Sequence, residues 1–155
     1  MSRPLHQALL AAVALLGSLP AVALTPAEVF ALVSPSVWRV QTLDADRLPL
    51  GQGSAVVVGP GVLVTNCHVL ARARHVQVRR DGQGTSLSAR LMLWDPPRDL
   101  CQLQVDNLSA PAVKLGAAAQ AVVGQPAYAI GHPRGLDLTM SAGLVSSFRR
   151  NAAGQ

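Results

Sequence analysis

Short apolar segments at intervals of about ten residues, separated by glycine and proline, constrain the fold of this 155-residue chain more than any other feature. In several of them apolar and polar residues alternate, which is the period of a β-strand with one buried face. The segments are residues 37–42, 54–58, 61–65, 75–79, 87–93, 100–105, 126–130 and 138–148. This pattern predicts an all-β barrel or sandwich.

The N-terminus has a different character. Arg3 and His6 precede an apolar run, residues 8–16, and Ala21-Val22-Ala23 forms an A-x-A cleavage site. This order is typical of a secretory signal peptide, and the run is shorter than the roughly 20 apolar residues that a membrane span needs. We expect residues 1–23 to be removed and the protein to be exported, to the periplasm or beyond, without a membrane anchor. A buried N-terminal helix is the alternative.

A short helix is expected next, within residues 24–35. Thr25 can serve as its N-cap and Pro26 as its first residue, and Glu28 places an acid in the first turn. Pro35 should follow its end.

The positive charge of the chain does not point to nucleic acid. The formal net charge is +5, but the arginines are scattered, with short pairs only at Arg79-Arg80 and Arg149-Arg150. Aromatic residues make up 3% of the chain, so no platform for stacking bases accompanies the charge. We therefore expect a basic, solvated surface and no nucleic-acid partner.

The chain has two cysteines, Cys67 and Cys101. A single pair in an exported protein favours one disulfide, and two free buried thiols are the alternative. A metal site built from these cysteines with His68 and His75 lacks a recognised ligand spacing, so we expect neither a metal nor another cofactor.

His68 and Asp99 are the residues most suited to catalysis. His68 follows the polar end of an apolar strand, and Asp99 begins another apolar strand. Acyl transfer by serine needs a neutral imidazole to take the hydroxyl proton and a carboxylate to fix its tautomer. A single histidine after a strand is more often an ordinary surface or core residue, so the two residues alone leave both interpretations open.

The motifs around these residues resemble those of the trypsin-like (chymotrypsin-fold) serine peptidases, most closely the HtrA-like, or Deg, periplasmic group. The resemblance covers about residues 34–150, and its motifs occur in the family's order. The matching stretches are residues 51–54 (GQGS), 64–69 (VTNCHV), Asp95 with 98–100 (RDL), 114–116 (KLG), 129–136 (AIGHPRGL) and 141–147 (SAGLVSS).

This resemblance implies two antiparallel β-barrels with the cleft between them. Residues 36–116 would form the complete first barrel, with His68 as general base and Asp99 as the acid that orients it. Residues 117–155 would begin a truncated second barrel. The family's nucleophile lies in a Gly-Asn-Ser-Gly-Gly or Gly-Asp-Ser-Gly-Gly loop, and this sequence contains neither that loop nor the oxyanion hole that accompanies it.

Three other polar residues in the matching stretches are assigned structural roles. Ser54 lies on a strand entering the first barrel, and His132 lies in a Gly-His-Pro turn. Asp95 lies in a Trp-Asp-Pro-Pro turn, where aspartate commonly accepts hydrogen bonds from its own backbone.

The resemblance also bears on the cysteines. If His68 and Asp99 meet in the cleft, Cys67 and Cys101 should lie together behind it, because neighbouring residues of an extended chain point to opposite faces. We therefore expect a Cys67–Cys101 disulfide joining the two strands, and not a cysteine nucleophile beside His68.

The activity that the resemblance implies is serine-type endopeptidase activity on protein or peptide substrates. Without the nucleophile, we expect this fragment to be inactive alone, as the product of an incomplete or interrupted gene. Two alternatives remain. One is a non-enzymatic exported β-domain that binds a peptide or partner by strand addition, and the other is a split enzyme completed by a second chain.

Overall fold

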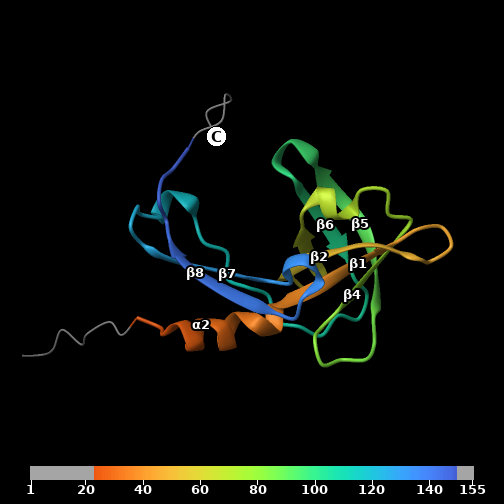
Figure 1. Cartoon of the computed structure of the whole chain (residues 1–155), viewed down its shortest axis with the longest axis horizontal. Coiled ribbons are helices and arrows are strands. Elements are labelled where there is room, and N and C mark those ends of the chain that lie inside the picture. Colours follow the sequence, from red (N-terminus) through yellow and green to blue (C-terminus); the bar gives the residue numbers. More distant parts are fainter. Residues whose placement is uncertain (1–22, 150–155) are drawn as a thin grey trace, which may run out of the picture.

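The computed structural model describes residues 23–149 (Figure 1). The predicted signal peptide lies outside these residues except for Ala23. One α-helix, α2 (Pro26–Val33), is followed by the strands β1 (Val37–Leu43), β2 (Pro49–Gly59), β3 (Val62–Thr65), β4 (His75–Arg79), β5 (Leu87–Asp95), β6 (Leu100–Gln104), β7 (Pro126–Gly131) and β8 (Thr139–Leu144). Short 3₁₀ turns are η1 (Ser34–Ser36), η2 (Cys67–Leu70), η3 (Pro96–Arg98), η4 (Ala118–Gln120) and η5 (Pro133–Gly135).

The first six strands form a closed antiparallel barrel in the order β1-β2-β3-β6-β5-β4. Strands β7 and β8 pair with each other as a separate two-stranded antiparallel sheet, from Pro126↔Leu144 to Gly131↔Thr139. The all-β fold class predicted from the sequence is therefore confirmed, with a complete first barrel.

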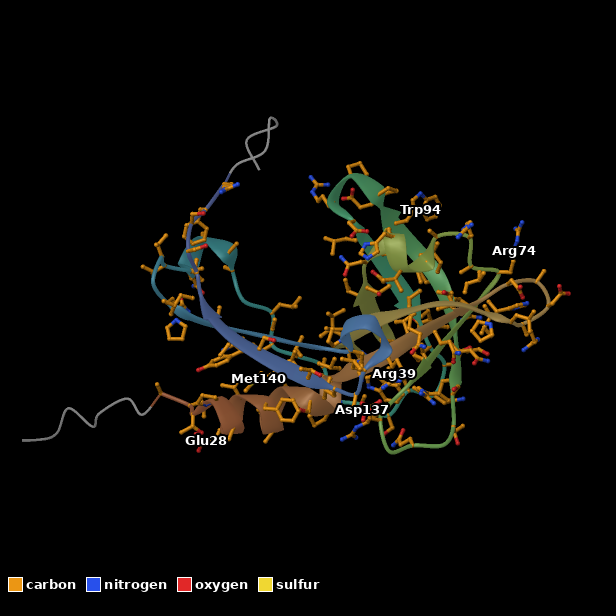
Figure 2. All side chains as sticks on the ribbon, viewed as in Figure 1. Glu28, Arg39, Arg74, Trp94, Asp137 and Met140 are labelled. Carbon is orange, nitrogen blue, oxygen red and sulfur yellow. A yellow bond between two sulfur atoms is a disulfide. The ribbon has the colours of Figure 1, made fainter. Side chains whose placement is uncertain are left out.

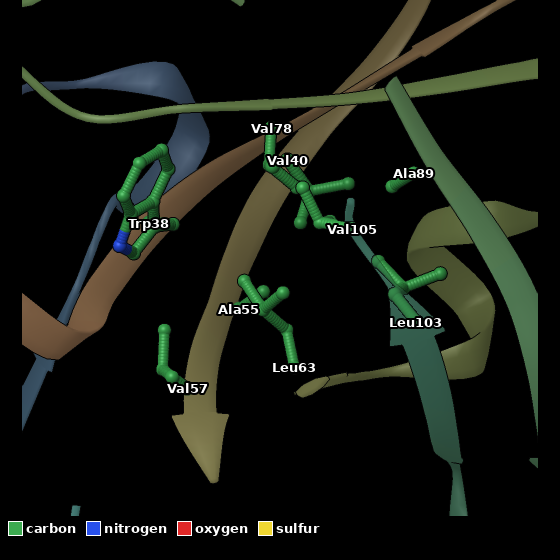
Figure 3. Close-up of a cluster of buried hydrophobic side chains, with 9 residues drawn as sticks. All are labelled: Trp38, Val40, Ala55, Val57, Leu63, Val78, Ala89, Leu103 and Val105. Atoms are coloured by element: carbon green, nitrogen blue, oxygen red, sulfur yellow. The ribbon is translucent and has the colours of Figure 1, made fainter. Parts of the chain in front are cut away.

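The barrel interior is filled by small aliphatic side chains from every barrel strand (Figure 3). Trp38 and Val40 alternate along β1, as do Ala55 and Val57 along β2, because side chains of a strand point alternately to its two faces. Only one of the nine core residues is aromatic. Burying each valine or leucine contributes about 1.5–3 kcal/mol. The other core residues are Leu63, Val78, Ala89, Leu103 and Val105.

Helix α2 lies beside the β7–β8 sheet, and both lie on the same side of the barrel (Figure 1). Its N-terminus is a capping box, in which the Thr25 hydroxyl accepts from the Glu28 amide at 3.3 Å and the Glu28 carboxylate accepts from the Thr25 amide at 2.7 Å. Among residues 23–149, no helix is long and apolar enough to cross a membrane.

Two strands differ from the sequence prediction by four residues or more at one end, and the others by at most two. β2 begins at Pro49, where residue 54 was expected, because Gly51, Gln52 and Gly53 pair with β1. Glycine disfavours strands on its own, so this part of β2 depends on its partner strand. β8 ends at Leu144, four residues before the predicted end.

Candidate functional site

His68 lies on η2, the 3₁₀ turn that follows β3. The Thr65 hydroxyl donates to the Ser54 carbonyl at 2.7 Å, which anchors the end of β3 to β2. One residue beyond His68, Val69 packs directly on Gly53, where a Cβ atom would lie 2.7 Å from the valine methyl carbons. Gly53 thus allows the turn that carries His68 to lie against β2.

Asp99 lies between η3 and β6 in a left-handed backbone conformation, with φ 54° and ψ 40°. The preceding turn is held by Asp95, whose carboxylate accepts from the Arg98 amide at 3.3 Å and pairs with the Arg98 guanidinium at 2.5 Å. Asp95 therefore contacts its own turn, whereas Asp99 is turned toward η2.

The two candidate residues meet at the rim of the barrel. One Asp99 carboxylate oxygen lies 2.6 Å from His68 Nδ1, and the other accepts a hydrogen bond from the His68 amide at 2.8 Å. The Asp99 carbonyl accepts from the Cys67 amide at 3.3 Å and from the Asn66 side-chain amide at 3.1 Å. Backbone and side chain together fix the position of the imidazole against the carboxylate.

The electrostatics of the pair favour one tautomer of His68. The His68 amide, followed by the imidazole, holds the pKa of Asp99 below its usual range. An ionised carboxylate at Nδ1 keeps a proton on that nitrogen, which leaves Nε2 as the basic atom. The His68 side chain is 72% exposed and the Asp99 side chain 39%, so Nε2 is open to a reactant.

Behind this pair, the structure joins Cys67 and Cys101 in a disulfide with Cα atoms 5.0 Å apart. These are the two cysteines that we expected to pair, but the geometric reason that we gave for the pairing is not the one that the structure shows. Cys67 begins a 3₁₀ turn and is not on extended backbone, so the divergence of Cys67 and His68 comes from the turn and not from strand alternation. Cys101 faces the barrel interior from β6, opposite Thr65.

The Ser54 and His132 side chains lie away from His68, where the barrel meets the β7–β8 sheet. The Ser54 hydroxyl accepts from the His132 amide at 2.8 Å. The His132 imidazole is buried and lies 3.1 Å from an Asp81 carboxylate oxygen. Sequence reasoning did not single out Asp81, or Arg39 beside it, because an Asp-Gly turn and an alternating strand residue carry no sign of such a contact.

A small cavity of about 250 Å³ adjoins the His68 turn. It is lined by residues of β1, β2, η2 and the turn after η2, among them Gln52, His68 and Arg72. Within residues 23–149, no group of three or more His, Cys, Asp or Glu side chains is arranged to hold a metal.

Comparison with known proteins places this geometry in a family. The family described as trypsin-like peptidase domain matches residues 53–155. Protease Do-like 1, chloroplastic, of Arabidopsis thaliana is 38% identical over 115 residues, which cover 70% of this chain and 25% of that protein. A probable periplasmic serine endoprotease, DegP-like, of Pseudomonas fluorescens is 36% identical over 109 residues, covering 70% of this chain and 23% of that protein.

A solved structure agrees with these relatives. The HtrA-type protease AlgW with tripeptide superposes with a TM-score of 0.74 at 32% identity, covering 84% of this chain and 42% of that one. The chain thus spans about a quarter of the length of the curated relatives. The matched residues, the relatives and the closed barrel agree, and the chain belongs to the trypsin-like peptidase domain family, with homology to the HtrA serine proteases.

Proposed function

We propose that this chain supplies the base and the orienting acid of a serine-type endopeptidase. The observation that carries the proposal is the 2.6 Å contact between His68 Nδ1 and Asp99, together with the second Asp99 oxygen on the His68 amide. Such a carboxylate fixes both the tautomer and the orientation of a general base.

In this role His68 Nε2 would take the proton of a serine hydroxyl as that oxygen attacks the scissile carbonyl carbon. Asp99 would stabilise the resulting imidazolium without accepting its proton. The imidazolium would then protonate the leaving amine, and a second round with water would release the acyl group. A Gly-x-Ser-Gly-Gly stretch does not occur in these 155 residues. In this proposal the nucleophile and the oxyanion donors would therefore come from further residues of the protein or from a second chain.

The same proposal places the protein outside the cytoplasm, in the periplasm or beyond, with protein or peptide substrates. The charged start, apolar run and A-x-A site of residues 1–23 support export. A disulfide and relatives named as periplasmic endoproteases are consistent with it. We further propose residues 36–116 as the first barrel domain and 117–155 as the beginning of the second.

A second function is favoured by one observation. Within the described residues the β7–β8 sheet has two strands, so the outer edge of each strand offers backbone groups to another chain. An exported β-domain could bind a peptide there by strand addition, with no hydrolysis.

The test is to purify the product of the entire reading frame that contains these residues and to measure its hydrolysis of β-casein. We expect His68→Ala to reduce kcat/KM by at least about 1,000-fold, and the matched control His75→Ala to have little effect. If the protein binds casein without hydrolysing it, and His68→Ala leaves this binding unchanged, the result would support strand addition and contradict the peptidase proposal. Hydrolysis that survives His68→Ala would also contradict it.

A further inference from the structure

The contact between the barrel and the β7–β8 sheet contains charged groups that the proposed catalytic site does not use. Arg39 comes from β1, Asp81 from the turn between β4 and β5, and His132 from the end of β7. The Arg39 and His132 side chains are 8% and 1% exposed, and that of Asp81 is 30% exposed. We refer to these three residues as the ionic junction.

Arg39 reaches from the barrel to the segment between β7 and β8. Its guanidinium donates to the Gly135 carbonyl at 3.2 Å and the Leu136 carbonyl at 3.1 Å. It also pairs with Asp81 at 3.0 Å and Asp137 at 3.3 Å. Figure 2 shows Arg39 and Asp137 close together where the η5 segment passes over the barrel. One barrel side chain thus holds three consecutive residues of the connection.

Asp81 holds both ends of the same segment. One of its oxygens accepts from the Leu138 amide at 2.8 Å and lies 3.1 Å from His132 Nε2. Two glycines allow this region to approach β2 closely. A Cβ on Gly131 would lie 2.8 Å from the Ser54 hydroxyl oxygen, and one on Gly135 would lie 3.0 Å from the Gln52 amide oxygen. Segment 132–138, which connects β7 and β8, is therefore held on the barrel through polar contacts.

We propose that the ionic junction is an acid-sensitive clasp, which seats the β7–β8 sheet on the barrel at neutral pH and releases segment 132–138 when His132 takes up a proton. The inference concerns the placement of the sheet, and it is independent of whether the protein hydrolyses peptides.

The hydrogen bonds explain why a proton would open the clasp. His132 Nε2 faces the Asp81 carboxylate and therefore carries the proton of the neutral ring. Its Nδ1 is buried and has no hydrogen-bond partner among the described residues. A proton added to Nδ1 would be an unsatisfied, charged donor in a buried place, which is costly.

The surrounding charges are mixed. Asp81 and Asp137 favour the imidazolium, whereas Arg39 opposes it, and Arg79, the exposed register partner of Arg39 on β4, adds positive charge to the same sheet. Burial outweighs the acids and lowers the pKa of His132. Partial burial acts to raise the pKa of Asp81, but the Leu138 amide, His132 and Arg39 together lower it.

The direction of the pH effect follows from these shifts. A released His132 has its ordinary pKa of about 6.5, so below that pH the open state binds a proton that the closed state does not. The opening equilibrium should therefore rise by up to about tenfold per pH unit below pH 6.5, until the lowered pKa of the closed state is reached. Asp81 reinforces this below about pH 4.

The test is amide hydrogen exchange by NMR on the chain, from pH 7.5 to pH 4.5. The Leu138 and His132 amides report the clasp, and those of Val40 and Leu103 report the barrel core. After correction for intrinsic exchange, we expect protection of Leu138 to fall at least tenfold while core protection is retained. The proposal is contradicted if Leu138 and the core residues lose protection together at every pH. It is also contradicted if the protection of Leu138 does not change with pH.

A matched variant isolates His132. In His132→Gln the side-chain amide can still donate to Asp81, from about the position of Nε2, but it does not titrate. We expect the pH dependence of Leu138 protection between pH 7.5 and pH 4.5 to disappear in His132→Gln and to persist in the control His75→Gln. An unchanged pH profile in His132→Gln would refute the proposal, and the wild-type series remains decisive if the variant fails to fold.

Discussion

The chain contains two His–Asp pairs of similar composition in opposite environments. His68 and Asp99 are exposed at the rim of the barrel, and His132 and Asp81 lie at the contact between the barrel and the β7–β8 sheet. In the first pair the histidine is 72% exposed, and in the second it is 1% exposed. The same pair of residue types can thus stand at an accessible place or join two elements in a buried one, and burial makes the difference. The exposed imidazole is accessible to a reactant, whereas the buried one contacts both the barrel and the β7–β8 connection.

The two pairs also differ in what holds them. The exposed pair is supported by covalent and backbone constraints: the Cys67–Cys101 disulfide behind it and the His68 amide on Asp99. The pair of His132 and Asp81 is supported by a guanidinium, because the buried Arg39 places a positive charge beside the partly exposed Asp81 carboxylate. The exposed pair is thus held by a disulfide and a backbone hydrogen bond, and the buried pair by a neighbouring charge.

The largest expected effect concerns the exposed pair. Asp99→Asn should retain the contact with the His68 amide but remove the charge that keeps a proton on Nδ1. In the complete gene product we expect kcat to fall by about 10⁴-fold. Casein hydrolysis measures the loss, and an unchanged thermal midpoint would show that the fold is retained. A loss smaller than tenfold would remove Asp99 from the proposed mechanism.

The disulfide should have the next largest effect. It closes a loop between residues 34 positions apart, and the chain-entropy model gives about 3–4 kcal/mol for a loop of that size. We expect the double variant Cys67→Ser, Cys101→Ser to lose this amount in urea unfolding. Amide hydrogen exchange of the double variant at neutral pH should show whether protection is lost mainly at residues 67 and 68. A loss confined to these amides would show that the disulfide supports the exposed pair in particular.

The buried pair should depend on Asp81. Asp81→Ala would leave Arg39 buried without this partner, and we expect a loss of about 2–3 kcal/mol, below the range for fully buried pairs because Asp81 keeps 30% exposure. Asp106→Ala is the matched control, since Asp106 pairs with Arg90 at the surface, and it should cost less than about 1 kcal/mol. Equal urea midpoints for the two variants would contradict the contrast between buried and exposed charges.

The smallest expected effect is on the titration of Asp99. Because its pKa is lowered, its contribution to stability should be complete above the ordinary value of about 3.9 and should be lost as the pH falls through the lower native value. The ¹³C shift of the Asp99 carboxyl should therefore titrate below pH 3.9. His68→Ala should move the midpoint upward only in part, because the amide of residue 68 still donates to Asp99. A midpoint that does not move would mean that the imidazole has no influence on it.

Much of the fold could be predicted from the sequence because strand periodicity is a local signal. The alternating residues of β1 and β4, the apolar run of β3 and the largely apolar segment of β6 identified those strands directly. The N-terminal half of β2 was missed because Gly51 and Gly53 carry no strand signal of their own. Only pairing with β1 and the approach of Val69 explain why glycines lie there.

The candidate site, too, was predicted in part from local motifs and depends in part on contacts that only the folded structure shows. The motifs around His68 and Asp99 indicated the two residues, and the structure brings them to 2.6 Å, although their catalytic role stays a proposal. The sequence did not reveal that Cys67 and His68 lie on a 3₁₀ turn, or that Asp99 adopts a left-handed conformation. The turn that carries His68 depends on the packing of Val69 against Gly53, which belongs to another strand and comes close only in the folded barrel. The left-handed Asp99 follows a local turn held by Asp95, and its carboxylate reaches the His68 amide only in the folded barrel.

By itself, the sequence determined the all-β class, the capped helix and the family, since each depends on residues that are close together or on motifs in a fixed order. Export stays a prediction from the sequence. Only the tertiary structure decided that Arg39, Asp81 and His132 form one junction. These residues come from three separate elements, and folding brings them together while it buries Arg39 and His132.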